Sequence, residues 1–565
     1  MENHEQLKYQ QWVNQAEEDS DIISELKSIN GNSDAIKDAF YRDLAFGTGG
    51  LRGTIGAGTN RMNIYTVGKA SQGLANYIIA NFPADQRRIA VSRDSRHKSD
   101  LFAEVAAGVF AANGIQVEMY REIMPTPCLS FATRELNCAA GIMVTASHNP
   151  SKYNGYKVYG ADGCQITTEA AAVILAEIEK LDEFTDVKRM DFDTAVSEGK
   201  VAYISDDVYD HFVAAVRGES LLADGEDIDR NVSIVYSPLN GTGLKPVTRT
   251  LKESGFTNIF VVPEQEQPDG DFPTCPFPNP EIKEAMALGM KYAAERGADL
   301  LLANDPDCDR AGTAVRAADG SYVLLSGNEM GMLLLDYICA RRTENGTMPQ
   351  DPELVKTIVT IDMADRIAAH YGVKTVNLLT GFKFIGEEIT RLESLGKRDS
   401  YIFGFEESYG YLSGTYVRDK DGVNASFLIC EMFAYYKTRG ISLLDKLNEL
   451  YAEYGYCLNT LHSFEFDGAA GFDKMQGIMK HFREADIEGF GGKKLVEALD
   501  YAPGLDGLPK ADVLKFKLAD NCSVVVRPSG TEPKLKTYIS VSAADCEAAQ
   551  AVEAKIVDQL NAYFK

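Results

Sequence analysis

Short apolar runs alternate along most of the chain with longer segments of helical periodicity. The clearest runs are residues 89–91, 141–144, 232–236, 300–303 and 401–405, and each is followed by a polar loop. Buried strands that alternate with helices are typical of α/β domains. In open α/β sheets ligands bind outside the carboxyl ends of the strands, so these loops are the candidates for chemistry.

The pattern changes toward the end of the chain. Residues 522–526 and 535–541 predict two strands around a loop, followed by an amphipathic helix over 544–561, which indicates a smaller α+β module. The length of 565 residues fits three to five domains of ~100–200 residues each. The polar loops that follow the apolar runs are far apart in sequence, so we expect them to belong to separate domains that face one cleft. The expected domains are 1–220, 221–327, 328–454 and 455–565.

The formal charge of −26 restricts the partners of the chain. So acidic a protein is a poor candidate for binding nucleic acid or an anionic membrane through its bulk charge. It would also repel phosphorylated ligands at long range, so a phosphate site must be built from local Lys and Arg. We therefore expect small-molecule partners, and the sequence does not fix an oligomeric state.

Cysteine spacing and the first residues bear on location. The ten cysteines are scattered without a C-x-x-C pair, which disfavours a disulfide framework or a structural zinc site. The N-terminal residues lack the basic start and apolar stretch of a signal peptide, and no apolar run approaches the ~18 residues of a membrane span. These features predict a cytoplasmic protein.

The loop after residues 300–303 carries three carboxylates at alternate positions. Asp305, Asp307 and Asp309 can converge in a tight turn, and such convergence favours an oxygen-preferring cation such as Mg²⁺, Mn²⁺ or Ca²⁺. An EF-hand is excluded, because its Gly and Glu positions are Arg310 and Arg316 here. The alternative is a solvated acidic turn.

The loop 145–150 offers a nucleophile. Ser147 follows a buried strand, and His148 is the obvious base for an acyl-transfer reaction. However, adjacent side chains rarely point at one another, and there is no G-x-S-x-G elbow. Lys157, on the expected returning strand, could move a proton near a metal and a phosphate. The alternatives are an ordinary turn and a surface lysine.

Three further loops offer ligand-binding groups. Residues 527–534 combine arginine, hydroxyls, glycine and lysine, which suit a phosphate dianion, although a plain hairpin loop is the alternative. The glycine-rich residues 46–54 permit close backbone approach to a ligand and contain Arg52. Residues 404–410 place carboxylates and Ser408 at a strand end, where they could hold sugar hydroxyls or, for Ser408, cap a helix.

Taken together, these loops resemble those of the α-D-phosphohexomutase superfamily. The resemblance covers about residues 46–538, and the serine loop 145–150, the metal loop 305–310, the sugar loop 406–408 and the phosphate loop 527–531 occur in the family's order. It implies three similar mixed α/β domains and a smaller C-terminal α+β domain around a central cleft. In order, these would carry the phosphoserine, the metal, the sugar and the distal phosphate.

The resemblance also implies a role for each residue. Ser147 would carry the phosphoryl group, and a phosphoserine oxygen would bind Mg²⁺ together with Asp305, Asp307 and Asp309. The remaining catalytic residues would be Lys157, Arg52, Arg310 and His148. The substrate-binding residues would be Thr380, Gly381, Lys383, Glu406, Ser408, Lys420, Arg527, Ser529, Gly530 and Thr531.

The chain departs from the family pattern at two places. Cys308 replaces the common glycine of the metal loop, and Tyr409 follows the sugar-loop serine where many phosphomannomutases have a histidine nearby. Residues 405–411 and 418–422 look closest to the phosphoglucomutase branch, which also contains phosphopentomutases and glucose-1,6-bisphosphate synthases.

The implied activity is an isomerase that interconverts a sugar 1-phosphate and 6-phosphate through phosphoserine and a sugar 1,6-bisphosphate. Glucose phosphates are the expected substrates, with mannose phosphates next, and glucose 1,6-bisphosphate the expected activator. The alternatives are a phosphopentomutase, a glucose-1,6-bisphosphate synthase, a phosphatase or a non-catalytic sugar-phosphate-binding protein. The last is disfavoured, because a binder needs no combination of Ser147, three aspartates and Lys157.

Overall fold

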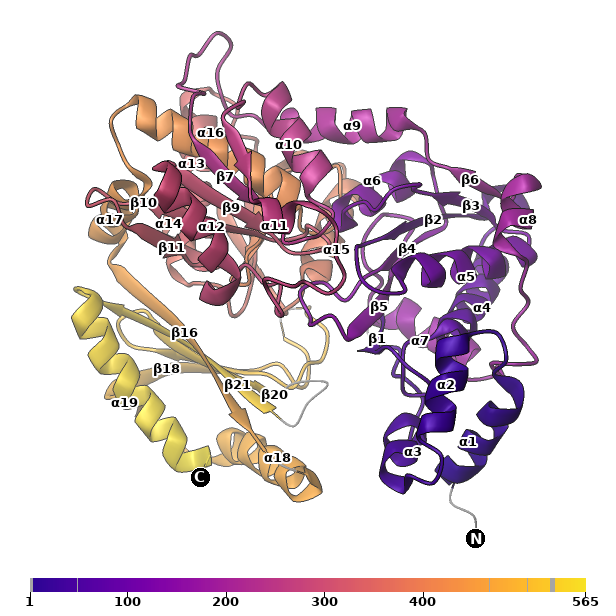
Figure 1. Ribbon diagram of the computed structural model, residues 1–565. Coiled ribbons are helices and arrows are strands. Elements are labelled where there is room, and N and C mark those ends of the chain that lie inside the picture. The colour runs from indigo at the N-terminus through magenta and orange to yellow at the C-terminus, as the bar shows by residue number, and fades with distance from the viewer. Residues whose placement is uncertain (1–3, 48, 467, 506, 529–533, 565) are drawn as a thin grey trace.

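The computed structural model describes residues 4–47, 49–466, 468–505, 507–528 and 534–564. The strands form four sheets in four successive parts of the chain (Figure 1). Among the described residues, no helix combines the length and the apolar character that crossing a bilayer requires.

The first sheet mixes parallel and antiparallel strands. Its order is β1 (Gly50–Thr54), β5 (Tyr153–Gly160), β4 (Ala140–Val144), β2 (Arg88–Arg93), β3 (Gln116–Met119) and β6 (Val201–Tyr203). Strands β2, β3, β4 and β6 run parallel, whereas β5 returns antiparallel between β4 and β1. Ile89 and Val91 face one core and Ala90 faces another, so this strand is apolar at successive positions because both of its faces are covered.

Nine helices accompany this sheet among the described residues. They are α1 (His4–Gln15), α2 (Ser20–Ser28), α3 (Ser33–Phe40), α4 (Ile64–Asn81), α5 (Ser99–Ala112), α6 (Thr126–Glu135), α7 (Thr168–Ile178), α8 (Phe192–Ser197) and α9 (Asp206–Arg217). Helix α5 packs on α4 and on β2, while α6 packs on β2 and β4. The first three helices form an N-terminal cluster in which Trp12 is fully buried (Figure 1).

The second sheet repeats the same plan. Its order is β11 (Tyr322–Leu325), β10 (Ala311–Arg316), β9 (Leu300–Asn304), β7 (Ile234–Ser237) and β8 (Ile259–Val261). Its helices are α10 (Leu244–Glu253), α11 (Pro263–Glu266) and α12 (Lys283–Arg296). Along β9, Leu300 and Leu302 enter one core while Leu301 and Ala303 enter the other. The buried strand therefore ends directly at the acidic loop.

The third sheet has the order β13 (Lys374–Leu378), β12 (Glu353–Thr357), β14 (Tyr401–Glu406) and β15 (Gly410–Leu412). Its helices are α13 (Gly327–Glu344), α14 (Met363–His370), α15 (Phe382–Ser394), α16 (Gly422–Thr438) and α17 (Leu443–Tyr454). Helix α13 begins with a capping box between Ser326 and Glu329, which satisfies backbone donors at its first turn. Strand β14 is buried throughout and ends at Glu406.

The fourth sheet is antiparallel and larger than the sequence predicted. Its order is β16 (Tyr456–Glu465), β21 (Lys534–Ala543), β20 (Cys522–Pro528), β19 (Leu514–Leu518), β18 (Lys493–Asp500) and β17 (Gly489–Phe490). Helices α18 (Gly468–Glu484) and α19 (Cys546–Phe564) complete this part. The sequence predicted two strands, and β16 and β18, which it did not predict, mix apolar and polar residues without strict alternation. Arg527 lies within β20 rather than in the predicted loop.

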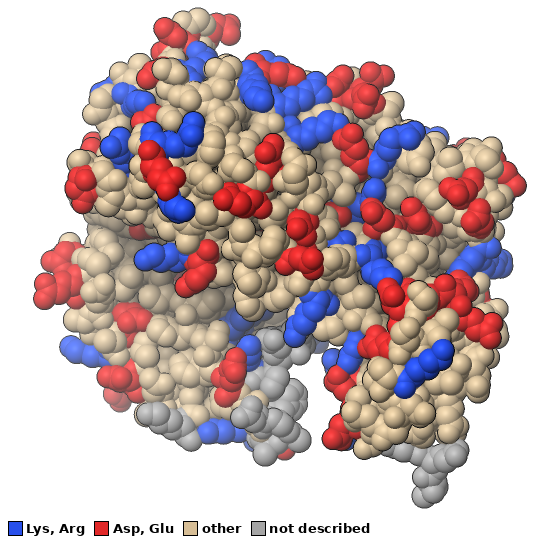
Figure 2. Space-filling view, in the orientation of Figure 1, with Lys and Arg blue, Asp and Glu red and all other residues tan. Residues whose placement is uncertain are grey.

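The predicted fold class is confirmed: three mixed α/β parts are followed by an α+β part. The fourth sheet lies below the second sheet and apart from the first (Figure 1). Figure 2 shows the molecule hollowed between the N-terminal and C-terminal parts, with Lys and Arg side chains at the inner end of the hollow.

Candidate active site

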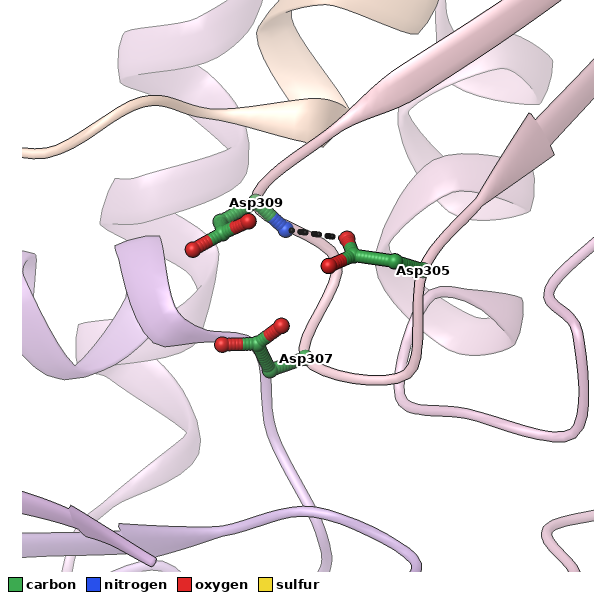
Figure 3. A group of neighbouring side chains, drawn as sticks. All are labelled: Asp305, Asp307 and Asp309. Atoms are coloured by element: carbon green, nitrogen blue, oxygen red, sulfur yellow. Dashed lines mark hydrogen bonds between the residues drawn. The ribbon is translucent and has the colours of Figure 1, made fainter. Parts of the chain in front are cut away.

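Three buried carboxylates meet in the loop after β9. Single oxygen atoms of Asp305, Asp307 and Asp309 all lie within 4.8 Å of one another (Figure 3). The turn between them requires a positive φ of 52° at Cys308, a conformation that favours glycine. Cys308 nevertheless adopts it, and its side chain is fully buried in a core shared by the second and third sheets. The cysteine therefore keeps the turn that the alternating carboxylates need to converge.

Hydrogen bonds orient the three carboxylates from different directions. Asp305 accepts the backbone N–H groups of Asp309 at 3.2 Å and Arg310 at 3.0 Å through one oxygen. Asp307 accepts the hydroxyl of Thr126 at 2.8 Å, across from the first sheet. One oxygen of Asp307 and one of Asp309 are buried without a hydrogen-bond partner. Buried carboxylate oxygens that face one another and lack donors are suitable ligands for a divalent cation.

Electrostatics supports the same conclusion. Burial, together with the neighbouring carboxylates of Asp309 and Asp307, raises the pKa of Asp305 well above its ordinary value. Burial also disfavours the charged form of Asp309, but Lys420, Lys157 and Arg310 hold its pKa below the ordinary value. The protein's own cations thus offset the charge of Asp309 but not that of Asp305, and a bound divalent cation would supply the missing charge.

Ser147 faces this loop from the first sheet. Its hydroxyl donates to Asp305 Oδ2 at 2.9 Å and lies 3.1 Å from His148 Nδ1. Adjacent side chains rarely point at one another, but these two do, and the backbone of Ser147 is left-handed with a φ of 51°. Burial and the guanidinium of Arg310 lower the pKa of His148 well below its ordinary value, so the imidazole is neutral.

Two lysine side chains contact the carboxylates. Lys157, on β5, lies 2.7 Å from Asp307 and 3.2 Å from Asp309. Lys420 reaches Asp309 at 2.9 Å from the third part of the chain. Burial would lower the pKa of both lysines, but the carboxylates raise it above the ordinary value. Both therefore enter the site as ammonium ions.

Arg310 and Arg52 occupy different positions at this site. The side chain of Arg310 is nearly buried, forms an ion pair with Glu281 and donates to the carbonyl of Ser408 at 3.1 Å. Arg52 is exposed on β1, opposite Gly155 in the antiparallel pair. Paired residues share a face of a sheet, and so do residues two apart, so Arg52 lies on the same face as Lys157.

The sugar-loop residues lie at the end of β14. Glu406 is buried and accepts the backbone N–H of Gly381 at 3.0 Å, which joins two loops of the third sheet. Burial raises the pKa of Glu406 to about 7, although Lys420 opposes this shift. Ser408 is half-buried, and Lys383 lies beside the ring of Phe384, with burial lowering the pKa of the lysine.

The distal phosphate loop is only partly described. Arg527 donates to the hydroxyl of Thr380, so the fourth sheet contacts the third next to Gly381. The predicted residues Ser529, Gly530 and Thr531 lie outside the described residues. Arg527 thus links the predicted phosphate loop to Thr380, one of the predicted substrate-binding residues of the third part.

Four successive family descriptions match the chain. The alpha/beta/alpha domains I, II and III of phosphoglucomutase/phosphomannomutase match residues 43–185, 210–320 and 326–454, and its C-terminal domain matches residues 475–559. The chain belongs to the phosphoglucomutase/phosphomannomutase family. This confirms the resemblance inferred from the four loops.

Individual relatives and solved structures align along most of the chain. A phosphoglucomutase of Staphylococcus saprophyticus is 34% identical over 529 residues, which cover 92% of this chain and 94% of the relative. A phosphoglucomutase/phosphomannomutase family protein of Burkholderia thailandensis has a TM-score of 0.67 at 19% identity, covering 92% of this chain and 97% of that one. The N-acetylphosphoglucosamine mutase of Aspergillus fumigatus, solved with GlcNAc-6P and magnesium, has a TM-score of 0.51 at 13% identity, covering 93% and 97%.

Sequence reasoning missed several residues that shape the site of this family member. Thr126 and Glu281 contact Asp307 and Arg310 from segments far away in the chain. Their residue types are common on surfaces, and nothing in their local pattern indicated a contact. Asp94 and Arg96 lie in the polar loop after β2, so the strand-end rule could have marked them.

Proposed function

We propose that the protein is a phosphosugar mutase that interconverts glucose 1-phosphate and glucose 6-phosphate through a phosphorylated Ser147. The observation that carries this proposal is the 2.9 Å contact between the Ser147 hydroxyl and the buried carboxylate triad. A hydroxyl among three carboxylates, two lysines and Arg310 contributes little to the stability of the fold. The same surroundings suit a hydroxyl that accepts and donates a phosphoryl group. The names of the curated phosphoglucomutases support glucose phosphates as substrates.

Asp305, Asp307 and Asp309 would hold Mg²⁺, with an oxygen of Ser147 or its phosphoryl group as a further ligand. The buried oxygens of Asp307 and Asp309 that lack partners support this assignment, as does the presence of magnesium in the Aspergillus mutase. When bound, Mg²⁺ would withdraw charge from the phosphoryl oxygens. Arg310 and Lys420 would add fixed positive charge from the protein itself.

In the first transfer the bond from phosphorus to the Ser147 oxygen breaks while a bond from phosphorus to a sugar oxygen forms. In the second transfer, from the bisphosphate, the bond to the other sugar oxygen breaks while the bond to the Ser147 oxygen forms again. Phosphoryl transfer mainly requires positioning and charge stabilisation, which the buried cations supply. The proton of the attacking sugar hydroxyl needs an acceptor, and Lys157 is our candidate. Its ion pairs with Asp307 and Asp309 favour the ammonium form, so Lys157 must first lose its proton to act as a base. Arg52 and His148 would flank the transferring group.

The bisphosphate must then present its other phosphate to Ser147. We propose that Arg527, with Ser529, Gly530 and Thr531, binds whichever phosphate is not reacting. Glu406, Ser408, Thr380, Gly381 and Lys383 would hold the ring. The contact of Arg527 with Thr380 supports a shared pocket for the distal phosphate and the sugar. Glucose 1,6-bisphosphate would prime Ser147 and is the intermediate of each cycle.

The four functions would belong to four domains. We assign residues 1–220 to the serine, 221–327 to the metal, 328–454 to the sugar and 455–565 to the distal phosphate. The sheets support this division, because each lies within one of these ranges. The transfer site would then form where three domains meet, and the fourth would complete the pocket.

A side-by-side assay tests the function. Glucose 1-phosphate, mannose 1-phosphate and ribose 1-phosphate are supplied separately with Mg²⁺ and a trace of glucose 1,6-bisphosphate, and all products are analysed. We expect glucose 6-phosphate to form fastest. A dominant pentose reaction would indicate a phosphopentomutase, accumulated bisphosphate a synthase, and free phosphate a phosphatase. No turnover of any sugar would contradict the proposal.

A further inference from the structure

The polar loop after β2 carries a buried ion pair with no role in the mechanism described so far. Asp94 and Arg96 are both almost inaccessible, and the Arg96 Nε lies 3.3 Å from Asp94 Oδ2. A buried ion pair is costly to form unless further hydrogen bonds satisfy both partners. Its other contacts therefore indicate what the pair does.

The Arg96 guanidinium donates to four backbone carbonyls of the serine loop and the strand that follows it. Its terminal nitrogens reach the carbonyls of Pro150 at 3.0 Å, Tyr153 at 3.1 Å, Ser147 at 2.5 Å and Asn149. The planar, permanently charged fork of arginine suits several acceptors at fixed angles, which the single ammonium of lysine cannot reproduce. Arg96 thus fixes the loop on the C-terminal side of the reactive serine.

Asp94 fixes the same loop from the N-terminal side. Its carboxylate accepts the hydroxyl of Thr145 at 2.6 Å, and the Thr145 oxygen accepts the backbone N–H of Ser147 at 2.8 Å. The ion pair therefore supports both peptide groups of Ser147. A residue other than glycine at a φ of 51° needs such support, because this conformation is unfavourable on its own.

The metal-binding part of the chain covers this ion pair. The ring of the fully buried Phe272 lies 5.0 Å from the Arg96 guanidinium. Close by, the backbones touch: a Cβ added at Gly270 would lie 2.8 Å from the backbone nitrogen of His97. The second part of the chain, which carries Asp305, thus packs directly on the group that orients Ser147.

We propose that Arg96, paired with Asp94 and covered by Phe272, is a positioning residue that sets the Ser147 hydroxyl against the metal loop. This inference rests on the proposed function for its catalytic consequence. Arg96 touches neither the reacting atoms nor the proposed sugar pocket. Its loss should therefore slow phosphoryl transfer at Ser147 and leave sugar-phosphate binding nearly unchanged.

The test uses the full-length variants Arg96→Lys and Phe272→Leu, with Phe256→Leu as the control. Phe256 is a buried core residue of the same α/β part. Phosphorylation of Ser147 by glucose 1,6-bisphosphate with Mg²⁺ is followed by quenched mass spectrometry, and glucose 1-phosphate affinity by calorimetry. Displacing a reacting group by about 1 Å can cost about 100-fold in rate, so we expect Arg96→Lys to be about 10- to 100-fold slower. The affinity for glucose 1-phosphate should change less than about threefold, because Arg96 does not touch the proposed sugar pocket.

Phe272→Leu should reduce the phosphorylation rate about 3- to 10-fold, because it removes a buried cation–π contact. Phe256→Leu should leave the rate unchanged despite a comparable loss of stability. A folded Arg96→Lys variant with the wild-type rate would overturn the inference. If Arg96→Lys does not fold, equal rates for the two phenylalanine variants would overturn it.

Hydrogen exchange separates this inference from the proposed function. We expect the backbone amides of residues 145–153 to exchange faster in Phe272→Leu than in Phe256→Leu, with or without sugar phosphate. If wild-type Ser147 is never phosphorylated, the proposed function fails, and the exchange comparison alone decides whether Arg96 orders the loop. Equal exchange in the two variants would then reject the positioning role.

Discussion

The two ends of the proposed substrate pocket are built differently. At the transfer end, Ser147, the three aspartates and Lys157 are held by several hydrogen bonds or ion pairs that join separate sheets. At the distal end, Arg527 makes one described hydrogen bond to the third part, with Thr380, while the fourth sheet packs on the same part away from Arg527, where Lys515 and Ser523 both contact Asp362. A reaction that needs fixed geometry at the transferring phosphoryl, but must accept a bisphosphate in two orientations, requires this contrast. The predictions below test it from its rigid end to its adjustable end.

Removing the nucleophile should have the largest effect. Ser147→Ala deletes the oxygen that would carry the phosphoryl group, so kcat should fall by about 10³-fold or more while the fold is kept. Steady-state assays and thermal unfolding measure the two quantities. Ser151→Ala, in the same loop, is the matched control and should remain active. Near-normal turnover by Ser147→Ala would show that no phosphoserine is involved.

Weakening the metal site should cause the second largest fall in turnover. Asp307→Asn removes one of three buried carboxylate charges, and we expect a fall in kcat of about 10²-fold and a higher Mg²⁺ requirement. Asp319→Asn, in an exposed turn of the same part, is the control and should behave like the wild type. Full activity of the wild type in excess chelator would mean that the triad is only an acidic turn.

Much of the transfer end could be predicted from the sequence. The alternation of Asp305, Asp307 and Asp309 after an apolar run indicated convergence, and Lys157 was placed on a returning strand. What could not be predicted arises from contacts between distant segments. Thr126 and Phe272 act through packing of one part of the chain on another, and Glu281 reaches Arg310 from a distant segment of the same part. Local periodicity encodes neither kind of contact.

The fourth sheet shows a second limit. Strand β18 has the sequence KKLVEALD, in which apolar and charged residues are mixed without strict alternation, so its pattern predicts no strand clearly. It forms a strand because it pairs antiparallel with β19. Pairing between separate segments of the chain overrides a weak local preference for strand or loop. The packing of this sheet on the third part of the chain, where Lys515 contacts Asp362, could not be anticipated either, because it depends on the tertiary arrangement.

Arg527→Ala should test the distal end without changing sugar preference. Losing a charge-assisted contact to phosphate costs ~1.5–3 kcal/mol, so kcat/KM should fall about 10- to 100-fold for every sugar. Arg483→Ala, on α18 of the same part, removes an exposed arginine side chain as the control. A changed ranking of glucose, mannose and ribose phosphates would show that Arg527 contacts the ring.

Glu406→Gln, unlike Arg527→Ala, should change the sugar preference. Because Glu406 is proposed to accept ring hydroxyls, its loss should penalise most the sugar it contacts best and alter the ranking. Assays of the same three sugars give the comparison with Arg527→Ala. An equal penalty for all three would require the two loops to exchange roles.

The smallest expected effect is a change in the pH profile. Burial raises the pKa of Glu406 to about 7, so the native carboxyl is protonated in a window where the unfolded one, with its ordinary pKa near 4.5, is ionised. The native state then binds more protons, and this group's contribution to stability is lost as pH rises through about 7. Thermal unfolding of Glu406→Gln across this range should depend less on pH than that of the wild type. Parallel profiles would contradict the assigned shift.

The most direct test of the account is the phosphoenzyme itself. Purified protein is incubated with glucose 1,6-bisphosphate and Mg²⁺, and the intact mass and tryptic peptides are then analysed. We predict one phosphoryl group, located on Ser147, which is lost when glucose 1-phosphate is added and is recovered in glucose 1,6-bisphosphate. Interconversion of the glucose phosphates without any phosphoryl group on Ser147 would contradict the account.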